Sequence, residues 1–398
     1  MMGCGARLWF DSILPISPFE RGPCAVTIES ASGALIRRDE VEVAVLGAGN
    51  GGCAVAFDWA QHGPNVRLFA RAEYPGEVAA IAERGEIVST GELSGAAPIS
   101  YAGHDAGRTV SGADLIMVVG PAYATEGFAL AAAPHLTPEQ AIVVCPTSCL
   151  GSFAFRRAAG LSHDDDRYLV GETSTLPYAV RMSAPATIHV FVKLRAGLWV
   201  AATPRSGTER LRTMLGEVYP GIGAADSVLT TTLQNGNPVI HPAVTLCNAA
   251  LIERTGGDFN FYEDGITPAV GRLMHAVDSE RMAIAAALGQ TIASDPAIGV
   301  MQGYMIEENY DTGYSTAPGF RGIRAQSELD NRYLTEDVGY TMVLFTELAR
   351  AVGVPTPTMD AVIQTASALL GRDFHREAPR TLANLGLSGL DTAGLVKL

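Results

Sequence analysis

The 398-residue sequence contains little charge: Lys, Arg, Asp and Glu make up 18% of it, whereas 47% of its residues are hydrophobic. Disordered chains are richer in charge and poorer in apolar residues, so this composition indicates a chain that buries a core. Positive charge is the scarcer sign, because 28 basic residues face 42 acidic ones and the formal net charge is −14. Binding a phosphate backbone needs a concentrated basic surface. Neither nucleic acid nor an anionic membrane is therefore an expected partner.

Long apolar runs and metal-type cysteine patterns are also missing. No uncharged apolar run reaches the roughly 18 residues that a membrane-spanning helix needs. The six cysteines, at positions 4, 24, 53, 145, 149 and 247, form no CxxC pair, and no histidine cluster stands beside them at zinc spacing. We therefore expect reduced thiols, no bound metal and a cytoplasmic protein.

A secretory signal is not expected at the N-terminus. The only apolar patch in residues 1–40 contains Arg7, Asp11 and Pro15, whereas a signal peptide needs an uninterrupted apolar core. We expect residues 1–40 to be a poorly ordered extension outside the fold. The remaining length is too great for one ordinary domain and fits two, each large enough to bury its own core.

Glycine, by contrast, is abundant, and the 43 glycines include a cluster near the start of the expected fold. A short apolar run rich in valine, 41–46, leads directly into the loop 47–52 (GAGNGG), and a helix-like run, 53–60, follows it. Strand, tight glycine turn and helix in this order are typical of a loop that holds the pyrophosphate of a dinucleotide.

Each residue of this loop has an expected role. Gly47 allows the turn, Gly49 lets the backbone approach a pyrophosphate, and Gly52 lets strand and helix pack closely. Asn50 and Gly51 complete the candidate cofactor-binding set, because the phosphates would meet the N–H groups at the start of the helix.

The surroundings of the loop decide its meaning, since glycine patterns arise by chance in a chain with 43 glycines. Further strand-like runs follow at 65–70, 114–120 and 141–145, with helix-like spacers between them. This alternation predicts a parallel sheet with helices on its faces. We therefore expect a Rossmann-type α/β domain over residues 41–204.

The type of dinucleotide depends on the end of the second strand. NAD-binding folds place an acidic side chain there for the ribose hydroxyls, but this chain has Phe69, Ala70 and Arg71. A guanidinium can pair with a 2′-phosphate, although Arg71 could equally be a solvated loop residue. The pattern favours NADP(H) over NAD(H).

The second half of the chain changes character near residue 204. After a predicted strand pair, 186–193 with 197–203, the run 204–207 (PRSG) breaks the pattern and helical periodicity follows. We expect an all-α C-terminal domain over residues 205–398.

One helix of this half has both ends marked. Thr267 can cap it, Pro268 fits its first turn and Gly289 suits its left-handed end. Two more helices are expected over 342–352 and 359–370.

His241 stands in this half between two prolines, and since it directly precedes Pro242 we expect a helix to begin just after it. A lone histidine among apolar residues is more often structural, but an imidazole can also accept and release a proton near neutral pH. Arg332 and Asp337, five residues apart, either open a surface helix or bind a substrate carboxylate and orient His241. Spacing alone leaves both readings open.

Lysine is nearly absent, with only Lys193 and Lys397 in the chain. Two-domain hydroxy-acid and ketopantoate reductases are similar in outline, but they polarise the substrate oxygen with a lysine of the helical domain. A hydroxy-acid or ketopantoate reductase mechanism would therefore lack its lysine acid in this chain. A non-catalytic NADP-binding sensor is the more distant alternative.

Over residues 41–398 the chain resembles the opine dehydrogenases of the octopine and nopaline type. The segments that carry the resemblance are 47–52, 171–174, 237–248, 262–268, 277–281 and 331–338. The resemblance implies that His241 is the catalytic histidine with Asp337 as its partner. It also implies that Arg332 binds a carboxylate, while Glu172 and Thr173 line the amino-acid side of the pocket.

The resemblance further implies the reaction. An amino acid amine and an α-keto acid such as pyruvate would condense to an imine, which NAD(P)H would reduce to an N-(carboxyalkyl) amino acid. The expected partners are these two small molecules, and a homodimer is expected only because it is the commonest oligomer. The chain departs from the family at Ala70, where the acid of NADH users is absent, and over residues 1–40.

Overall fold

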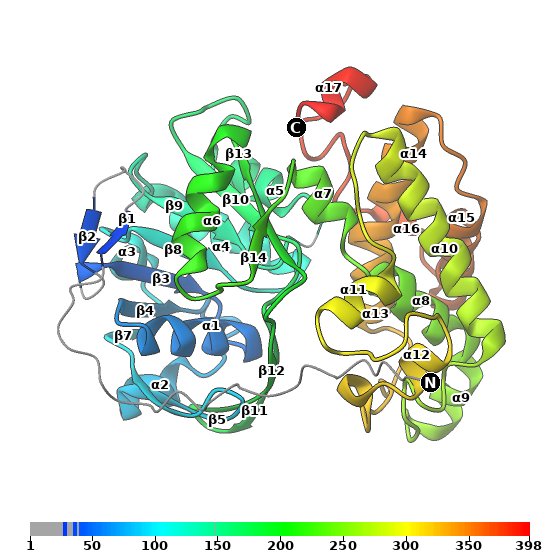
Figure 1. The fold of residues 1–398 in the computed structure, drawn as a ribbon, viewed down its shortest axis with the longest axis horizontal. Helices are drawn as coiled ribbons and strands as arrows, with labels where there is room; N and C mark the ends of the chain where they lie inside the picture. Colours follow the sequence, from blue (N-terminus) through cyan, green and yellow to red (C-terminus); the bar gives the residue numbers. More distant parts are fainter. Residues whose placement is uncertain (1–26, 30–34, 38–39, 148) are drawn as a thin grey trace, which may run out of the picture.

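A computed structural model of the chain describes residues 27–29, 35–37, 40–147 and 149–398. It places a sheet-based domain beside a helical domain (Figure 1). The predicted class is therefore confirmed: a Rossmann-type α/β domain precedes an all-α domain. Within the described residues, no helix is both long and apolar enough to cross a membrane.

The first domain is built on an eight-stranded sheet with the strand order β14-β13-β10-β9-β8-β3-β4-β7. Its strands pair in parallel except where β13 runs antiparallel to β10. The strands are β3 (Glu42–Leu46), β4 (Asn65–Phe69), β7 (Tyr101–Gly103), β8 (Leu115–Val118), β9 (Ala141–Val144), β10 (Leu169–Thr173), β13 (Leu198–Thr203) and β14 (Ile222–Ala224).

Apolar side chains alternate between the two faces of this sheet. Val43 and Val45 of β3 enter one buried cluster, and Ala44 and Leu46 enter another, because successive strand residues point to opposite sides. Both faces are covered, as parallel sheets require. The covering helices are α1 (Asn50–Gln61), α2 (Val78–Arg84), α3 (Ala106–Val110), α4 (Thr125–Ala132), α5 (Gly151–Ala158) and α6 (Thr208–Gly216).

A second, four-stranded sheet has the order β11-β12-β5-β6. Its strands are β5 (Glu86–Gly91), β6 (Gly95–Pro98), β11 (Tyr178–Ala184) and β12 (Thr187–Lys193). The strands predicted at 186–193 and 197–203 exist as β12 and β13, but they do not pair. β12 lies between β11 and β5, whereas β13 lies between β10 and β14. The chain changes sheet between them, which periodicity within each strand cannot reveal.

The sheet domain continues past the expected boundary near residue 204. α6 packs on β13, and β14 then pairs with β13 in parallel, with Trp199 opposite Gly223. The Rossmann-type part therefore extends to about Ala224. The proline and glycine at 204–207 mark a turn within this domain rather than its end.

The extension expected over residues 1–40 lies mostly outside the described residues. Within it, β1 (Thr27–Glu29) and β2 (Leu35–Arg37) form an antiparallel pair, with Ile28 opposite Ile36. The expectation of poor order for this extension stays a prediction.

The second domain consists of helices and, among the described residues, a single isolated bridge between Asn260 and Arg324. Its helices are α7 (Val228–Leu233), α8 (Asn237–Cys247), α9 (Ala249–Thr255), α10 (Pro268–Ala287), α11 (Asp295–Met301), α12 (Thr312–Ser315), α13 (Arg332–Thr335), α14 (Val343–Val352), α15 (Pro357–Leu370), α16 (Phe374–Glu377) and α17 (Thr392–Val396). A π-helical turn, Asp337–Met342, joins α13 to α14.

α10 has the ends that the sequence predicts. The Thr267 side chain accepts a hydrogen bond from the N–H of Val270, and Pro268 is the first helical residue. Gly289 follows the C-terminus with φ +70°, a conformation that a glycine adopts without strain.

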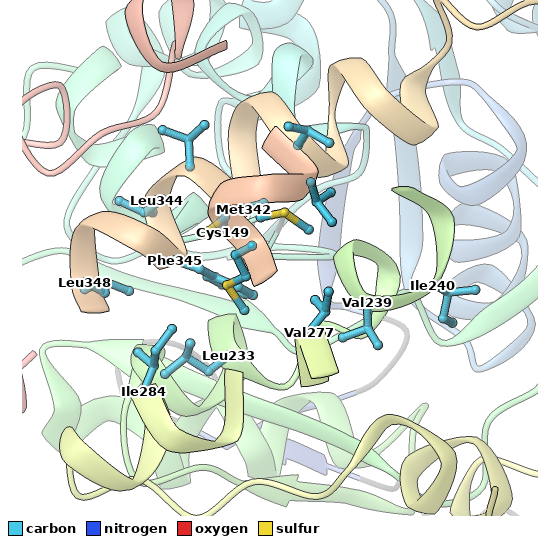
Figure 2. Packing of buried hydrophobic residues seen from close by; sticks show 14 of the residues in the cluster. Cys149, Leu233, Val239, Ile240, Val277, Ile284, Met342, Leu344, Phe345 and Leu348 are labelled. Atoms are coloured by element: carbon cyan, nitrogen blue, oxygen red, sulfur yellow. The ribbon is translucent and has the colours of Figure 1, made fainter. Parts of the chain in front are cut away.

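One buried cluster joins the two domains. Figure 2 shows Cys149 beside Met342 and Phe345, with Leu233 and Val277 in the same packing. Cys149 follows β9 of the sheet domain, and the other labelled residues belong to the helical domain. Burial of apolar surface therefore stabilises the contact between the domains.

Candidate active site

A cavity of about 1130 Å³ lies between the two domains. The sheet domain contributes the glycine loop to its lining, and the helical domain contributes α8 and residues of the segment 332–337. This volume exceeds the roughly 300–1,000 Å³ usual for a pocket that holds one small molecule. The cavity is therefore large enough for a dinucleotide together with smaller reactants.

Two glycines of the loop stand where the backbone packs too closely for a side chain, and a third borders open space. A Cβ on Gly47, where φ is +125°, would lie 1.9 Å from the Val119 carbonyl oxygen, and one on Gly52 would lie 1.7 Å from the Gly47 carbonyl oxygen. A Cβ on Gly49 would meet nothing within 4 Å. Gly47 and Gly52 thus bring strand and helix together, while Gly49 borders space in which a pyrophosphate fits.

The start of α1 is suited to an anion. The helix begins at Asn50 with Gly49 as its N-cap, and no side chain of the described residues caps its N–H groups. Such groups bind phosphate well. Asn50 and Gly51 line the cavity as expected, and Asn50 Oδ1 also accepts a hydrogen bond of 2.7 Å from the N–H of Met182, which holds the loop against β11.

Arg71 lies where the adenosine end of a dinucleotide would be. It borders the cavity next to Ala70, and its guanidinium lies close to Gly127 of α4. Its Nε is 3.4 Å from Glu73 Oε2, and both side chains are exposed. Exposed pairs of this kind are weak, so the guanidinium can exchange Glu73 for a phosphate.

On the helical-domain side of the cavity, His241 and Asp337 meet. The His241 Nδ1 lies 2.8 Å from Asp337 Oδ2, and both side chains are largely buried. Because a carboxylate only accepts hydrogen bonds, Nδ1 carries the donated proton and Nε2 keeps its lone pair. This is the arrangement of a histidine that can take up a proton at Nε2.

His241 lies inside a helix, contrary to the expectation that a helix begins just after it. α8 begins at Asn237, with Pro238 in its first turn and Pro242 within it. Val239, Pro242 and Val244 are buried, so packing outweighs the local preference against helical geometry before proline.

Asp337 opens the π-helical turn, which packs against α8. A π turn inserts one residue into an α-helical path and is frequent at functional sites. Here it allows the carboxylate to reach α8 while the apolar side of α14 stays in the core.

Aromatic rings fix the imidazole of His241. Tyr333 stacks on it with ring centroids 3.9 Å apart, and Phe261 meets it edge-on at 6.1 Å. The Tyr262 hydroxyl lies 3.3 Å from His241 Nε2. Burial, together with the nearby Tyr333 and acidic groups, raises the pKa of Tyr262 well above its usual value, so this hydroxyl stays protonated and can donate to Nε2.

Arg332 borders the cavity from the helical domain as well. Its Nη2 lies 2.9 Å from Glu336 Oε2, and 54% of its side chain is exposed. Glu336 is buried, and its Oε1 accepts a hydrogen bond of 2.8 Å from the N–H of Ala122 in the sheet domain. Burial raises the pKa of Glu336, against the opposing effect of Arg332. Arg332 therefore presents a positioned guanidinium to a ligand.

Glu172 and Thr173 do not line the cavity, so the expectation from the family resemblance is corrected for both. Both are fully buried in β10. Glu172 Oε1 accepts from the hydroxyls of Thr147 and Thr231 at 2.5 and 2.8 Å, and its Oε2 accepts from Ser152. Glu172 is a hydrogen-bonding centre beneath the cavity wall, since every acceptor position faces protein donors.

The segment 277–281 also has a structural role. Asp278 and Arg281 are buried and pair at 2.6 Å. Asp278 Oδ2 accepts from the N–H of Asp295 at 2.8 Å, and Arg281 donates to the carbonyl oxygens of Leu233 and Ala293. The pair thereby holds the two chain segments that enter α8 and α11 at the cavity.

Several residues of the site were not singled out from the sequence. Tyr262, Tyr333 and Glu336 stand within the segments 262–268 and 331–338 that carry the family resemblance. The resemblance therefore marks these positions but assigns them no function. Asp295, which also borders the cavity, carries no sequence signal.

No lysine is found at the site. Among the residues that the structure describes, neither Lys193 nor Lys397 lines the cavity. Lys193 Nζ instead lies 2.7 Å from the buried carboxylate of Asp58, which also accepts from the Tyr178 hydroxyl. A reductase mechanism that needs a lysine acid therefore finds no such group here.

A glycine-loop dinucleotide domain, a helical domain and a histidine–aspartate pair facing the cavity between them define an NAD(P)-dependent oxidoreductase. Two family models agree with this division. Residues 42–147 match the N-terminus of NAD-dependent glycerol-3-phosphate dehydrogenase, and residues 224–370 match the α-helical domain of NAD/NADP octopine/nopaline dehydrogenase.

Whole-chain relatives then specify the family. The chain is 36% identical over 360 residues to the opine dehydrogenase of Arthrobacter sp. (strain 1C), covering 88% of this chain and 97% of the relative. It therefore belongs to the opine dehydrogenase family, whose reaction is the NAD(P)H-dependent reductive condensation of an amino acid with an α-keto acid.

Solved structures share the fold. An octopine dehydrogenase in complex with NADH and agmatine superposes with a TM-score of 0.73 at 20% identity, covering 90% of this chain and 98% of that one. An NADP⁺-bound yersinopine dehydrogenase gives 0.67 at 15% identity, covering 90% and 97%. These structures confirm the predicted fold, and the whole-chain relative with the family model confirms the predicted family and enzyme class.

Proposed function

We propose that this enzyme joins the amine of an amino acid to a small α-keto acid, with His241 and Asp337 as its catalytic pair. The observation that carries the proposal is the 2.8 Å contact between His241 Nδ1 and Asp337 Oδ2 at the cavity. The bound nicotinamide cofactor supplies the hydride that reduces the imine carbon.

The condensation requires that a proton leaves the amine and that a proton reaches the departing hydroxyl. The amine attacks the keto carbon to give a carbinolamine, and the departing hydroxyl must be protonated to leave as water. His241 Nε2 takes the proton that the amine loses and returns one to the hydroxyl, as a general base and then a general acid. Asp337 holds the ring through Nδ1 and stabilises its cation.

Arg332 orients the keto acid. A guanidinium can bind a carboxylate through two parallel hydrogen bonds, and Arg332 borders the cavity near the catalytic pair. Fixing the carboxylate places the keto carbon beside His241, and orientation of this kind lowers the activation barrier.

Dependence on an amine tests the proposal. With NADPH and pyruvate, glyoxylate or 2-oxoglutarate, we expect cofactor oxidation only after an amino acid is added. The oxidation is measured as the loss of absorbance of the reduced nicotinamide. The control is the same keto acid without an amine. Equal oxidation without an amine would instead identify a hydroxy-acid dehydrogenase, which is the alternative from the sequence.

The cofactor preference is a further part of the proposal. Ala70 offers no carboxylate to ribose hydroxyls, and Arg71 borders the expected adenosine end. We propose that Arg71 binds a 2′-phosphate and that NADP(H) is preferred over NAD(H).

Replacing Arg71 by alanine tests this preference. Loss of one charge-assisted contact should lower kcat/KM for NADPH about tenfold or more and leave kcat/KM for NADH nearly unchanged. Arg84, which forms an exposed pair with Glu86 on the same domain, is the matched control, and Arg84→Ala should change neither value. A wild-type preference for NADH would refute the proposed role of Arg71.

A further inference from the structure

Arg181 borders the cavity and has no acidic partner among the described residues. Two other arginines of the cavity lining, Arg71 and Arg332, each pair with a carboxylate. The Arg181 side chain is exposed, and its Nη1 donates a hydrogen bond of 2.9 Å to the neighbouring carbonyl oxygen of Val180. This contact leaves the other N–H groups of a guanidinium, which has five, for a ligand.

β11 places Arg181 on the sheet-domain side of the cavity. The preceding residues of this strand, Ala179 and Val180, also line the cavity. The N–H of the next residue, Met182, donates to Asn50 Oδ1 at 2.7 Å. Because Asn50 belongs to the glycine loop, the strand that carries Arg181 is fastened to the expected pyrophosphate site. The guanidinium therefore has a defined position relative to the cofactor.

Arg181 also lies near the ring that stacks on the catalytic imidazole. Tyr333 stacks on His241 with centroids 3.9 Å apart. Burial raises the pKa of Tyr333, and the positive charges of Arg332 and Arg181 both oppose this rise. Because such an effect weakens with distance, one guanidinium from each domain lies near the same ring.

The proposed reaction brings two carboxylates into the cavity. The keto acid carries one and the amino acid carries the other, and both remain in the product, which is a dicarboxylate. Arg332 is assigned to the keto acid, so the carboxylate of the amino acid still needs a partner. A carboxylate that loses its hydration is costly unless it is paired or hydrogen-bonded.

The other polar groups near the catalytic pair do not supply this positive charge. Tyr304 brings a hydroxyl to the cavity, but burial raises its pKa to about 12, so it stays neutral near neutral pH. His241 pairs with Asp337 and is assigned to proton transfer. The acidic side chains of the lining would repel a carboxylate. In the described part of the lining, Arg181 is thus the cation that is left for the amino acid.

We infer that Arg181 binds the α-carboxylate of the amino donor through charge-assisted hydrogen bonds. This inference rests on the proposed function, since it takes Arg332 as the partner of the keto acid. One arginine from each domain then holds one substrate, and the amine meets the keto carbon at His241. The contact uses a group that every α-amino acid carries, so it does not depend on the side chain of the donor.

A comparison of amino acids with their α-amides tests this assignment, because the amide keeps the amine and the side chain but has no negative charge. Alanine, leucine, phenylalanine and arginine are each paired with their amide, at saturating NADPH and pyruvate. For a donor that is turned over, wild-type kcat/KM should exceed that of its amide by about a hundredfold. In Arg181→Gln this ratio should fall about tenfold or more, mainly through the KM for the amino acid.

The ratio isolates the contact, since the different basicity of amino acid and amide affects the wild type and the variant equally. In Arg181→Gln the KM for pyruvate and the Kd for NADPH should stay at their wild-type values. Arg181→Lys, which keeps the charge but not the planar fork, should lower the ratio by a smaller factor.

Arg195→Gln is the matched control. Arg195 follows β12 in the same sheet, pairs with Glu92 and does not border the cavity, so its ratio should equal that of the wild type. An unchanged ratio in Arg181→Gln would overturn the inference and leave the proposed function intact, whether the damage appears in the KM for pyruvate, in the Kd for NADPH or nowhere. Absence of turnover with every amino acid would overturn the proposed function together with this assignment.

Discussion

Replacing His241 by asparagine is expected to lower kcat by about a thousandfold, within the range that general acid–base catalysis contributes. Asparagine keeps a polar group near Asp337 but cannot exchange a proton at the Nε2 position. The Kd for NADPH, measured by fluorescence titration, should stay close to the wild-type value because the glycine loop belongs to the sheet domain, whereas His241 belongs to the helical domain.

The same pair predicts a large effect at Asp337. Asp337→Asn retains the size of the side chain, but its amide can donate to Nδ1 and favour the tautomer with the proton on Nε2. We expect kcat to fall by about a hundredfold or more, with a changed pH profile that a purely structural role would not produce.

A matched control separates chemistry from general damage. His375 is exposed on α16 and does not border the cavity, so His375→Asn should keep wild-type kcat and thermal stability. Turnover near the wild-type level in both His241→Asn and Asp337→Asn would remove the proposed mechanism.

The second large effect is expected at Arg332. Arg332→Gln should lower kcat/KM for the keto acid by about a hundredfold, as expected when a charge-assisted pair loses one partner, and the loss should appear mainly in KM. Arg332→Lys keeps the charge but not the planar fork, so it should recover only part of this loss.

A second arginine of the helical domain provides the comparison. Arg372 pairs with Glu377 at 3.0 Å outside the cavity, as Arg332 pairs with Glu336 at 2.9 Å. Arg372→Gln should leave the KM for the keto acid unchanged. If Arg332→Gln also leaves KM unchanged, Arg332 does not bind the keto acid carboxylate.

Local sequence predicts the parts of this fold that depend on local physics. The loop 47–52 is visible because a tight turn and close packing exclude side chains at Gly47 and Gly52. α10 is visible because its cap and its terminal glycine act within one turn of its ends.

The missed features depend on distant contacts. β12 and β13 were predicted as strands, but their partners are set by the path of the chain between two sheets. Glu172 stands in a segment that resembles the family, yet its direction is decided by threonines far away in the sequence. The start of α8 is likewise set by buried packing around Pro242.

The catalytic pair and the ring packed on it also depend on contacts between residues far apart in the sequence. His241 and Asp337 are 96 positions apart, so their spacing left a contact between them open, and only the family resemblance favoured it. The stacking of Tyr333 on the imidazole had no sequence signal of its own, because the spacing of aromatic residues does not give ring orientation.

The extra residue in the π-helical turn Asp337–Met342 changes the rotation of α13 relative to α14 about the helix axis. In an uninterrupted α-helix each residue is rotated by about 100° from the last, so the direction of the Asp337 carboxylate would be tied to the apolar stripe of α14. With a one-residue offset, the apolar side chains of α14 can change with the core while the Asp337 carboxylate keeps the direction that the reaction needs. Mutations that repack α14 can therefore accumulate without turning the acid away from its imidazole.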